Sequence, residues 1–335
     1  MQNHDLLQVL TREGVLLSVS VRYWRGCKKL RAEDIGLDSR KVSDRLISLG
    51  HKRLLPKEAT AQLGLIEGRA HAMVEGKTFP FLNGLAHFVP NSKLAEVSGK
   101  LKELEKEFWQ AKEQFIKEYA ALRESAATEW KAMAKKLVSD PERLVASIEA
   151  AFPAVGKMER FFRFDVELFQ ISVPERLGLD MLALGDQEEL IQARQQAAQE
   201  AAQKIRADTE AFVADCVATL REQTAKLCQE MLESINTCEA GVHQKTLNRL
   251  LKFIEQFKTM NFVNDIQMEQ QLDSVRKELL TRTAEEYRDS KKARTQLVAG
   301  LSQLHDTANR LAHQDATELV QRFGEMGRRK FHLAA

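Results

Sequence analysis

The segment from Arg22 to Arg31 carries the side chains best suited to hold an anionic partner. It has five basic residues and no acidic residue in ten positions, and Tyr23 and Trp24 are interleaved with them. Arginine and lysine can neutralise phosphates while an aromatic ring stacks on a base, and the same charges suit an acidic protein partner. The candidate contact residues are Arg22, Trp24, Arg25, Lys28, Lys29 and Arg31.

The same ten residues also fit a purely structural interpretation, in which a strand ends with Trp24 buried and its basic side chains in solvent. The chain has 50 basic and 48 acidic side chains and a formal net charge of +2. This near-balance argues against steering to nucleic acid by overall charge. Nucleic acid, an acidic protein and no partner at all therefore remain open for this segment.

Motifs that indicate catalysis are missing from the sequence. It contains no G-x-x-x-x-G-K-[ST], no G-x-G-x-x-G, no G-x-S-x-G and no H-E-x-x-H. His305 and His313 lie on one predicted helix, but they lack carboxylate or cysteine partners at ligand spacing. We therefore expect a non-enzymatic protein with no catalytic residues, cofactor or metal, although an active site assembled only in space would leave no such trace.

The four cysteines are scattered without paired spacing, which predicts reduced thiols and a cytoplasmic protein. Cys216 and Cys228 fall on the apolar side of a predicted helix, so we expect them to be buried as small hydrophobic residues. No apolar run approaches the roughly 20 residues that cross a bilayer, so no membrane partner is expected.

Residues 1–91 predict a compact α+β module. Apolar and polar residues alternate from Val15 to Trp24, as in a half-buried strand. Ala59 to Glu75 has a helical pattern. Thr78 to Val89 is apolar and contains Pro80, which indicates an irregular hairpin or loop.

Residues 92–151 predict one long helix followed by a short one. Ser92 is a plausible N-cap, and apolar residues then recur in steps of three and four from Leu94 to Leu137. Such steps form the narrow apolar stripe of a coiled coil. Asp140-Pro141 ends this helix, and Pro141 starts the next one, which runs to Ala151.

Residues 152–185 interrupt the helical pattern with a dense apolar cluster from Phe161 to Val173. The cluster is either a strand that pairs back to the N-terminal region or an apolar hinge, and we favour the strand. Residues 186–335 then predict helices at about 186–236, 241–259 and 264–326, the last with a heptad stripe from Leu297 to Leu311.

The fold class expected from these patterns is mainly α, with long coiled-coil-like helices forming a hairpin or bundle beside the small N-terminal module. A narrow stripe is buried when two or three such helices pack together. The long helices therefore either fold back on each other or pair with a second copy of the chain as a homo-oligomer.

The N-terminal third resembles a known bacterial family. The resemblance covers roughly the first 140 residues and rests on Val19-Ser-Val-Arg-Tyr-Trp-Arg-Gly26, Lys29-Leu30, Ser48-Leu-Gly50, Lys52-Arg53, the stretch from Gly76 to Pro90 and the long helix after it. Members of that family are carried by phages, plasmids and integrative elements. Their genes often sit beside those of a MoxR-type AAA+ ATPase and a von Willebrand factor A protein.

The resemblance implies a role in an ATPase-driven remodelling system. We therefore expect an adaptor or structural subunit that docks on the AAA+ ATPase or presents a target to it, with the N-terminal module or the apolar segment 158–174 as the docking patch. The alternative is a nucleic-acid-binding structural protein that uses residues 22–31.

Overall fold

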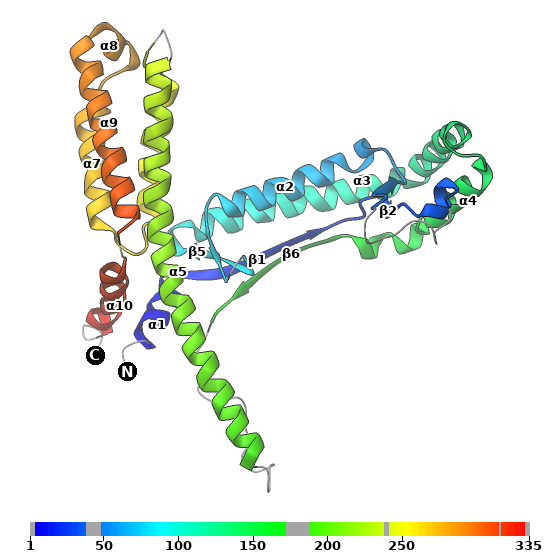
Figure 1. Ribbon diagram of the computed structural model, residues 1–335, viewed down its shortest axis with the longest axis horizontal. Coiled ribbons are helices and arrows are strands. Elements are labelled where there is room, and N and C mark those ends of the chain that lie inside the picture. The colour runs from blue at the N-terminus through cyan, green and yellow to red at the C-terminus, as the bar shows by residue number, and fades with distance from the viewer. Residues whose placement is uncertain are drawn as a thin grey trace. The chain divides into compact units, whose positions relative to one another are not determined.

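The computed structural model describes residues 4–37, 48–82, 84–171, 188–237, 241–314 and 316–331. The chain divides into two compact units (Figure 1), each made of segments that are far apart in sequence. Unit 1 comprises residues 1–17, 77–95 and 168–335, and unit 2 comprises residues 18–76 and 96–167. The expected mainly helical fold with a small sheet region near the N-terminus is confirmed.

A four-stranded sheet contains the strands predicted from the alternating and apolar segments. Its order is β4 (Phe79–Phe81), β5 (Ala86–Pro90), β1 (Gly14–Arg22) and β6 (Arg163–Phe169). The predicted hairpin is the antiparallel pair β4–β5, and β5 also pairs antiparallel with the first half of β1. Because β6 lies next to β1, the favoured interpretation of the later apolar segment as a strand is confirmed, while residues 172–187 lie outside the described residues.

The predicted long helix is α3 (Asn91–Leu137), and the short helix after it is α4 (Pro141–Ala151). Ser92 is not the N-cap, because α3 already includes it and its hydroxyl donates to the carbonyl of Thr259 in unit 1. Asp140 caps α4 instead, accepting from the backbone N–H of Arg143 at 3.1 Å.

In unit 2 the aromatic residues of the α3 stripe pack against other aromatic rings. Trp24 and Phe152 lie against Tyr119, with ring centroids 5.6 and 6.5 Å away, and the Tyr119 hydroxyl donates to the Pro153 carbonyl at 2.8 Å. Further rings from Phe162 and Phe164 contact the stripe at Phe115 and Phe108, one and three turns earlier. Aromatic rings from outside the helix therefore contribute to burying this part of α3. The remaining helix of unit 2 is α2 (Ala61–Glu75), as predicted.

Unit 1 is built largely from helices. These are α1 (His4–Glu13), α5 (Glu188–Thr237), α6 (Gln244–Met260), α7 (Ile266–Leu279), α8 (Ala284–Asp289), α9 (Lys291–Ala312) and α10 (Thr317–Phe331). The chain folds back so that α5 and α9 lie side by side and run in opposite directions (Figure 1). The predicted heptad residues of α9, from Leu297 to Leu311, are buried in this packing.

The single helix expected at 264–326 is wrong, because the segment contains α7, α8, α9 and most of α10. Its first helix is capped at the start of the segment, and two further side chains start new helices within it. Asp265 caps α7 by accepting from the Met268 N–H, Thr283 forms a capping box with Glu286 at α8, and Ser290 caps α9. An N-cap residue is non-helical and bonds the free N–H groups of the helix that follows, so each cap also marks the end of the preceding segment.

A buried ion pair links three helices of unit 1. The Arg221 guanidinium on α5 donates to the Asp265 carboxylate at 2.7 Å and to the carbonyl of Leu311, near the end of α9, also at 2.7 Å. Both side chains are about 95% buried. The carboxylate also caps α7, so one charge pair fixes α5, α7 and α9 relative to one another.

Replacing Arg221 with Met should lower the free energy of unfolding of unit 1 by about 3–5 kcal/mol, because it leaves the Asp265 carboxylate buried and unpaired. The matched variant Arg276→Met removes an exposed pair with Glu255 and should cost less than about 1 kcal/mol. Urea unfolding followed by far-ultraviolet circular dichroism measures both. Equal, small effects would contradict a structural role for the buried pair.

The two described cysteines of α5 are buried, as expected. Cys216 and Cys228 are at most 2% exposed, and burial raises the pKa of the Cys228 thiol to about 12. Since the thiolate is the reactive form, a maleimide at pH 8 should modify the half-buried Cys27 in the native protein and leave these two untouched until urea is added. Mass spectrometry of peptides locates the label. Rapid native labelling of Cys228 would contradict the burial.

Candidate functional site

The predicted segment from Arg22 to Arg31 does not form one continuous surface. It leaves β1 at Arg22, turns at Gly26, which has a φ of +60°, and enters the short strand β2 (Cys27–Lys29). Glycine suits this turn because side chains rarely adopt a positive φ. The segment therefore directs its basic residues to two separate places on unit 2.

Trp24 lies in the core of unit 2. It is 6% exposed, and its ring contacts Phe115, Tyr119 and Phe152. A ring in this position anchors the end of β1 to α3 and is not free to stack on a base. Trp24, whose aromatic ring suggested stacking on a base, therefore has a packing role in the core.

The exposed lysines belong to a two-stranded ribbon. Strand β2 pairs antiparallel with β3 (His51–Arg53), with Lys28 opposite Lys52 and Lys29 opposite His51. Lys28, Lys29, His51 and Arg53 are exposed, and Arg31 follows directly. We call these five residues the basic ribbon.

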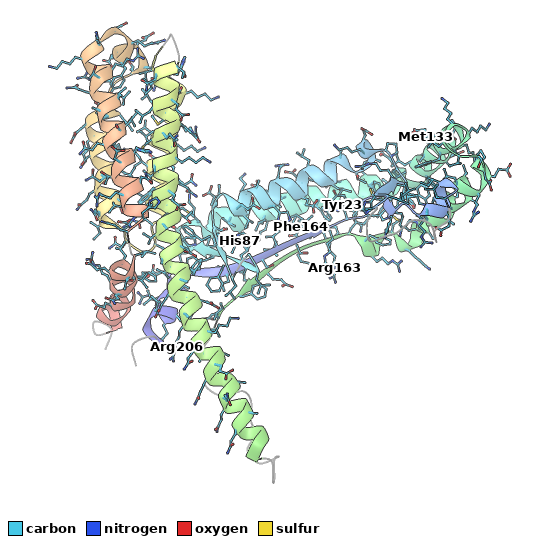
Figure 2. The ribbon with its side chains drawn as sticks, in the orientation of Figure 1. Tyr23, His87, Met133, Arg163, Phe164 and Arg206 are labelled. Atoms are coloured by element: carbon cyan, nitrogen blue, oxygen red, sulfur yellow. The ribbon has the colours of Figure 1, made fainter. Side chains whose placement is uncertain are left out.

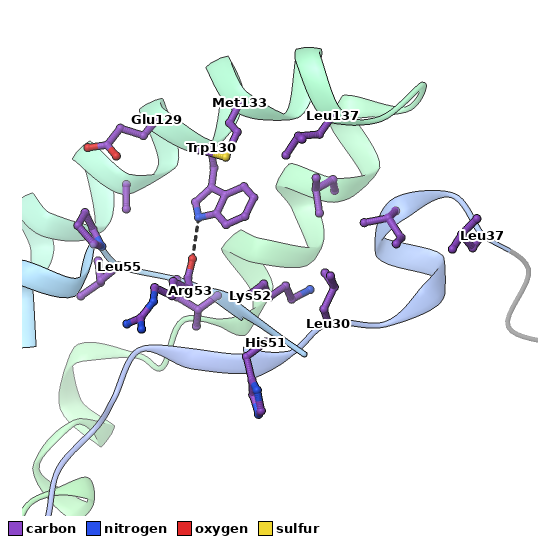
Figure 3. A pocket seen from close by; sticks show the side chains of 15 residues that line it. Leu30, Leu37, His51, Lys52, Arg53, Leu55, Glu129, Trp130, Met133 and Leu137 are labelled. Atoms are coloured by element: carbon purple, nitrogen blue, oxygen red, sulfur yellow. Dashed lines mark hydrogen bonds between the residues drawn. The ribbon is translucent and has the colours of Figure 1, made fainter. Parts of the chain in front are cut away.

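An apolar groove of about 700 Å³ lies beside the basic ribbon, between the last turns of α3, α4, β3 and the 3-10 helix η1 (Ala32–Ile35) (Figure 3). Three of its apolar side chains are well exposed: Leu37 at 46%, Met133 at 48% and Leu137 at 60%. The other lining residues are Leu30, Ile35, His51, Lys52, Arg53, Leu54, Leu55, Pro56, Ala126, Glu129, Trp130 and Leu144. The groove is thus an accessible apolar surface with basic residues along one side.

The α3 side of the groove is held against β3 by Trp130. Its indole N–H donates to the Arg53 carbonyl at 3.0 Å, as the dashed line in Figure 3 shows. Met133 and Leu137 follow Trp130 by three and seven positions, so the three share one helix face. The apolar periodicity predicted that these residues share one helix face, but we predicted no function for them. The feature that could have indicated a binding surface is that the apolar stripe continues to the end of the helix.

A buried polar cluster lies at the groove's η1 side. The Lys52 ammonium is 2.8 Å from the Asp34 carboxylate and donates to the Ser147 hydroxyl at 3.0 Å, and Ser147 donates to Asp34 at 2.8 Å. Burial raises the pKa of Asp34, but hydrogen bonds from Lys52, the Arg31 backbone and Ser147 outweigh burial and hold this pKa below its usual value.

The contact between Ser147 and Lys52 resembles a catalytic serine–lysine pair, but its hydrogen bonds support a structural role. An ammonium paired with a carboxylate has no lone pair with which to take the proton of Ser147. The three side chains come from η1, β3 and α4. Their closed set of hydrogen bonds joins the elements that form the walls of the groove.

An arginine-lined hollow of about 540 Å³ forms the second surface of unit 2. Its lining residues are Val21, Arg22, Tyr23, Arg25, Arg160, Phe161 and Arg163. Arg25 pairs with Glu67 at 2.6 Å and Arg163 with Asp165 at 4.0 Å, whereas Arg22 and Arg160 have no ion-pair partner among the residues that the structure describes. Sequence reasoning included Arg22 and Arg25 but missed Arg160 and Arg163, although Arg160-Phe-Phe-Arg163 repeats the spacing of Arg22-Tyr-Trp-Arg25.

Comparison with known families places the chain in one of them. Residues 11–306, from α1 into α9, match the family described as protein of unknown function, DUF3150. The chain belongs to the DUF3150 family. No curated protein and no solved structure matches this DUF3150 protein. Because the match includes segments of both units, both belong to the family's common architecture.

A metal-binding cluster and a membrane-spanning helix are both absent from the described residues of this DUF3150 protein. No group of three or more His, Cys, Asp or Glu side chains is placed there to hold a metal ion. His305 and His313 each bond near their own position instead, to Asp306 and to the Asn309 carbonyl. None of the described helices is long and apolar enough to cross a membrane.

Replacing Asp34 with Asn should lower the free energy of unfolding of unit 2 by about 3–5 kcal/mol at neutral pH, because Lys52 keeps its charge and loses its partner. The folded-state pKa of Asp34 is lowered. Its carboxylate therefore stabilises the protein above the unfolded pKa of about 3.9, and this contribution is lost as the pH falls through the folded pKa. The difference between wild type and variant should shrink in acid.

Urea unfolding followed by tryptophan fluorescence measures this difference, because Trp24, Trp109 and Trp130 all lie in unit 2. Glu107→Gln serves as the control, since it removes an exposed pair with Arg69 and should cost less than about 1 kcal/mol. A destabilisation by Asp34→Asn that stays constant down to pH 2 would contradict the role of the carboxylate.

Proposed function

We propose that this DUF3150 protein is a non-enzymatic adaptor that binds a segment of a partner protein in the apolar groove of unit 2. The observation that carries the proposal is the exposure of Leu37, Met133 and Leu137 together in one groove. Single exposed apolar residues are ordinary, whereas a contiguous apolar surface in a groove marks a binding site.

The groove's chemistry supports one kind of occupant: an amphipathic segment whose apolar side faces α3 and whose flanking residues are acidic. Trp130, Met133 and Leu137 present a helical face, which suits the packing of an apolar helix into a groove. His51 and Arg53 line the same groove, and the basic ribbon continues beyond it. Acidic residues at the ends of the segment would therefore meet basic side chains and set its direction.

The identity of the partner is proposed from the family resemblance of the N-terminal third. It is a MoxR-type AAA+ ATPase, together with its von Willebrand factor A protein, in the cytoplasm of a cell that carries a mobile element. The antiparallel packing of α5 on α9 supports a coiled-coil-like hairpin in unit 1, which we propose as the surface for further protein contacts, including a second copy of this chain.

Glutamate at Met133 or Leu137 should weaken binding of the AAA+ partner at least about tenfold, because a charge would be buried against the partner's apolar face. Leu65→Glu is the matched control: Leu65 lies on α2, is 62% exposed and does not line the groove. Fluorescence anisotropy with the labelled ATPase measures affinity, and the ATPase rate measured with each variant reports coupling.

Two results would contradict the proposal. The first is a purified AAA+ partner that neither binds this protein nor changes its ATPase rate in its presence. The second is equal binding by wild type, Met133→Glu and Leu137→Glu, with tryptophan fluorescence confirming that all three are folded. Loss of binding in Leu65→Glu alone would place the contact on α2 and away from the groove.

A further inference from the structure

The arginine-lined hollow is a separate site in unit 2, since none of its lining residues lines the apolar groove. Its four arginines come from two distant segments, at the end of β1 and at the start of β6, which are neighbouring strands. Figure 2 labels Tyr23 and Arg163, one from each segment. The fold thus concentrates positive charge that is divided between two places in the sequence.

The balance of charge in the hollow favours an anion. The Arg22 and Arg160 side chains are exposed and lack an ion-pair partner among the described residues, and the carboxylates of Glu67 and Asp165 offset only the other two. Four guanidinium groups facing one hollow repel one another until an anion enters. Guanidinium groups also bind phosphate through two parallel hydrogen bonds, which a lysine cannot do.

Two of the arginines are stacked on aromatic rings. The Arg25 guanidinium lies 5.0 Å from the centre of the Tyr23 ring, and Arg160 lies 4.9 Å from the centre of the Phe161 ring. A cation–π attraction favours a guanidinium over an aromatic ring, and guanidinium planes are surfaces on which nucleotide bases stack. A carboxylate-bearing peptide would use the charges but not these planar faces.

We propose that the hollow binds a nucleotide unit, with its phosphate between Arg22 and Arg160 and its base against the stacked guanidinium and ring planes. The volume of about 540 Å³ falls within the range of about 300–1,000 Å³ for small-molecule sites. The nucleotide is supplied either as a free molecule or as part of a single strand, and both carry the same phosphate and base.

The test uses the full chain and two probes: a fluorescein-labelled single-stranded oligothymidylate of about ten nucleotides, and unlabelled ATP as competitor. Anisotropy is measured over a series of salt concentrations. Each phosphate contact with a single strand contributes about 0.7 to the slope of log affinity against log salt. Arg22→Ala with Arg160→Ala should weaken binding at least about tenfold and, because both arginines contact the same phosphate, lower that slope by about 0.7.

The control variant carries Arg143→Ala and Arg282→Ala, two exposed arginines outside the hollow, so that the net charge changes equally. Its affinity should stay close to that of the wild type. Displacement of the oligonucleotide by ATP at similar nucleotide concentrations indicates a free nucleotide as the natural source. Displacement only by a second oligonucleotide indicates a strand, and both outcomes support the nucleotide site.

Three outcomes would overturn the proposal. One is the absence of binding to either probe at low salt. Another is an equal loss of affinity in the control variant and in the hollow variant, which would reveal a diffuse charge effect. The third is tight binding of a poly-glutamate peptide at the hollow without binding of either nucleotide probe, which would make the site an acidic-peptide site.

Discussion

A helix with a narrow apolar stripe must have that stripe covered along its whole length, or it presents an apolar surface to solvent. Helix α3 is 47 residues long, and this constraint organises unit 2. From Leu101 to Tyr119 its stripe is buried, and the cover includes rings from Trp24 just after β1, from β6 and from the segment after α4. Beyond Ala126 the cover is incomplete, and Met133 and Leu137 remain exposed. The groove is thus the end of the α3 stripe that no described residue covers.

Two buried ion pairs fix the relative positions of elements whose apolar contacts alone would specify those positions weakly. Arg221 and Asp265 join three helices of unit 1, and Lys52 and Asp34 join the 3-10 helix η1 to β3, with Ser147 adding α4. A buried pair adds little net stability compared with apolar residues, but it penalises every arrangement that separates its charges. The pair in unit 1 lies where α7 begins and α9 ends, and the pair in unit 2 lies among short elements.

The two surfaces of unit 2 differ in the chemistry that they offer. The groove presents aliphatic side chains next to the basic ribbon. The affinity of a partner segment would therefore depend first on its shape and apolar area, and then on its charge at the margin of the groove. The hollow presents guanidinium groups held by aromatic rings, so it selects for a compact anion with a planar group attached. Because the two surfaces share no lining residue, the two proposals about them can be tested independently.

The sequence by itself determined the features that depend on neighbours along the chain. Alternation predicted β1, the steps of three and four predicted α3, and the position of Cys216 and Cys228 on an apolar helix face predicted their burial. Features that depend on distant contacts were decided only by the tertiary structure. Trp24 was predicted as a contact residue, but α3 and Phe152 bury its ring. Local caps at Thr283 and Ser290 divided a segment that its apolar periodicity had predicted as one helix.

The same distinction between local and distant contacts applies to the candidate binding surfaces. Arg22 and Arg160 are far apart in sequence and become neighbours only because β1 and β6 are adjacent strands. Similarly, Met133 and Leu137 continue the apolar periodicity of the buried residues that precede them in α3. A period specifies which side of a helix a residue faces, whereas the coverage of that side depends on segments elsewhere in the chain. Local pattern therefore determined the elements of this protein, and long-range packing decided which of their faces remained available for binding.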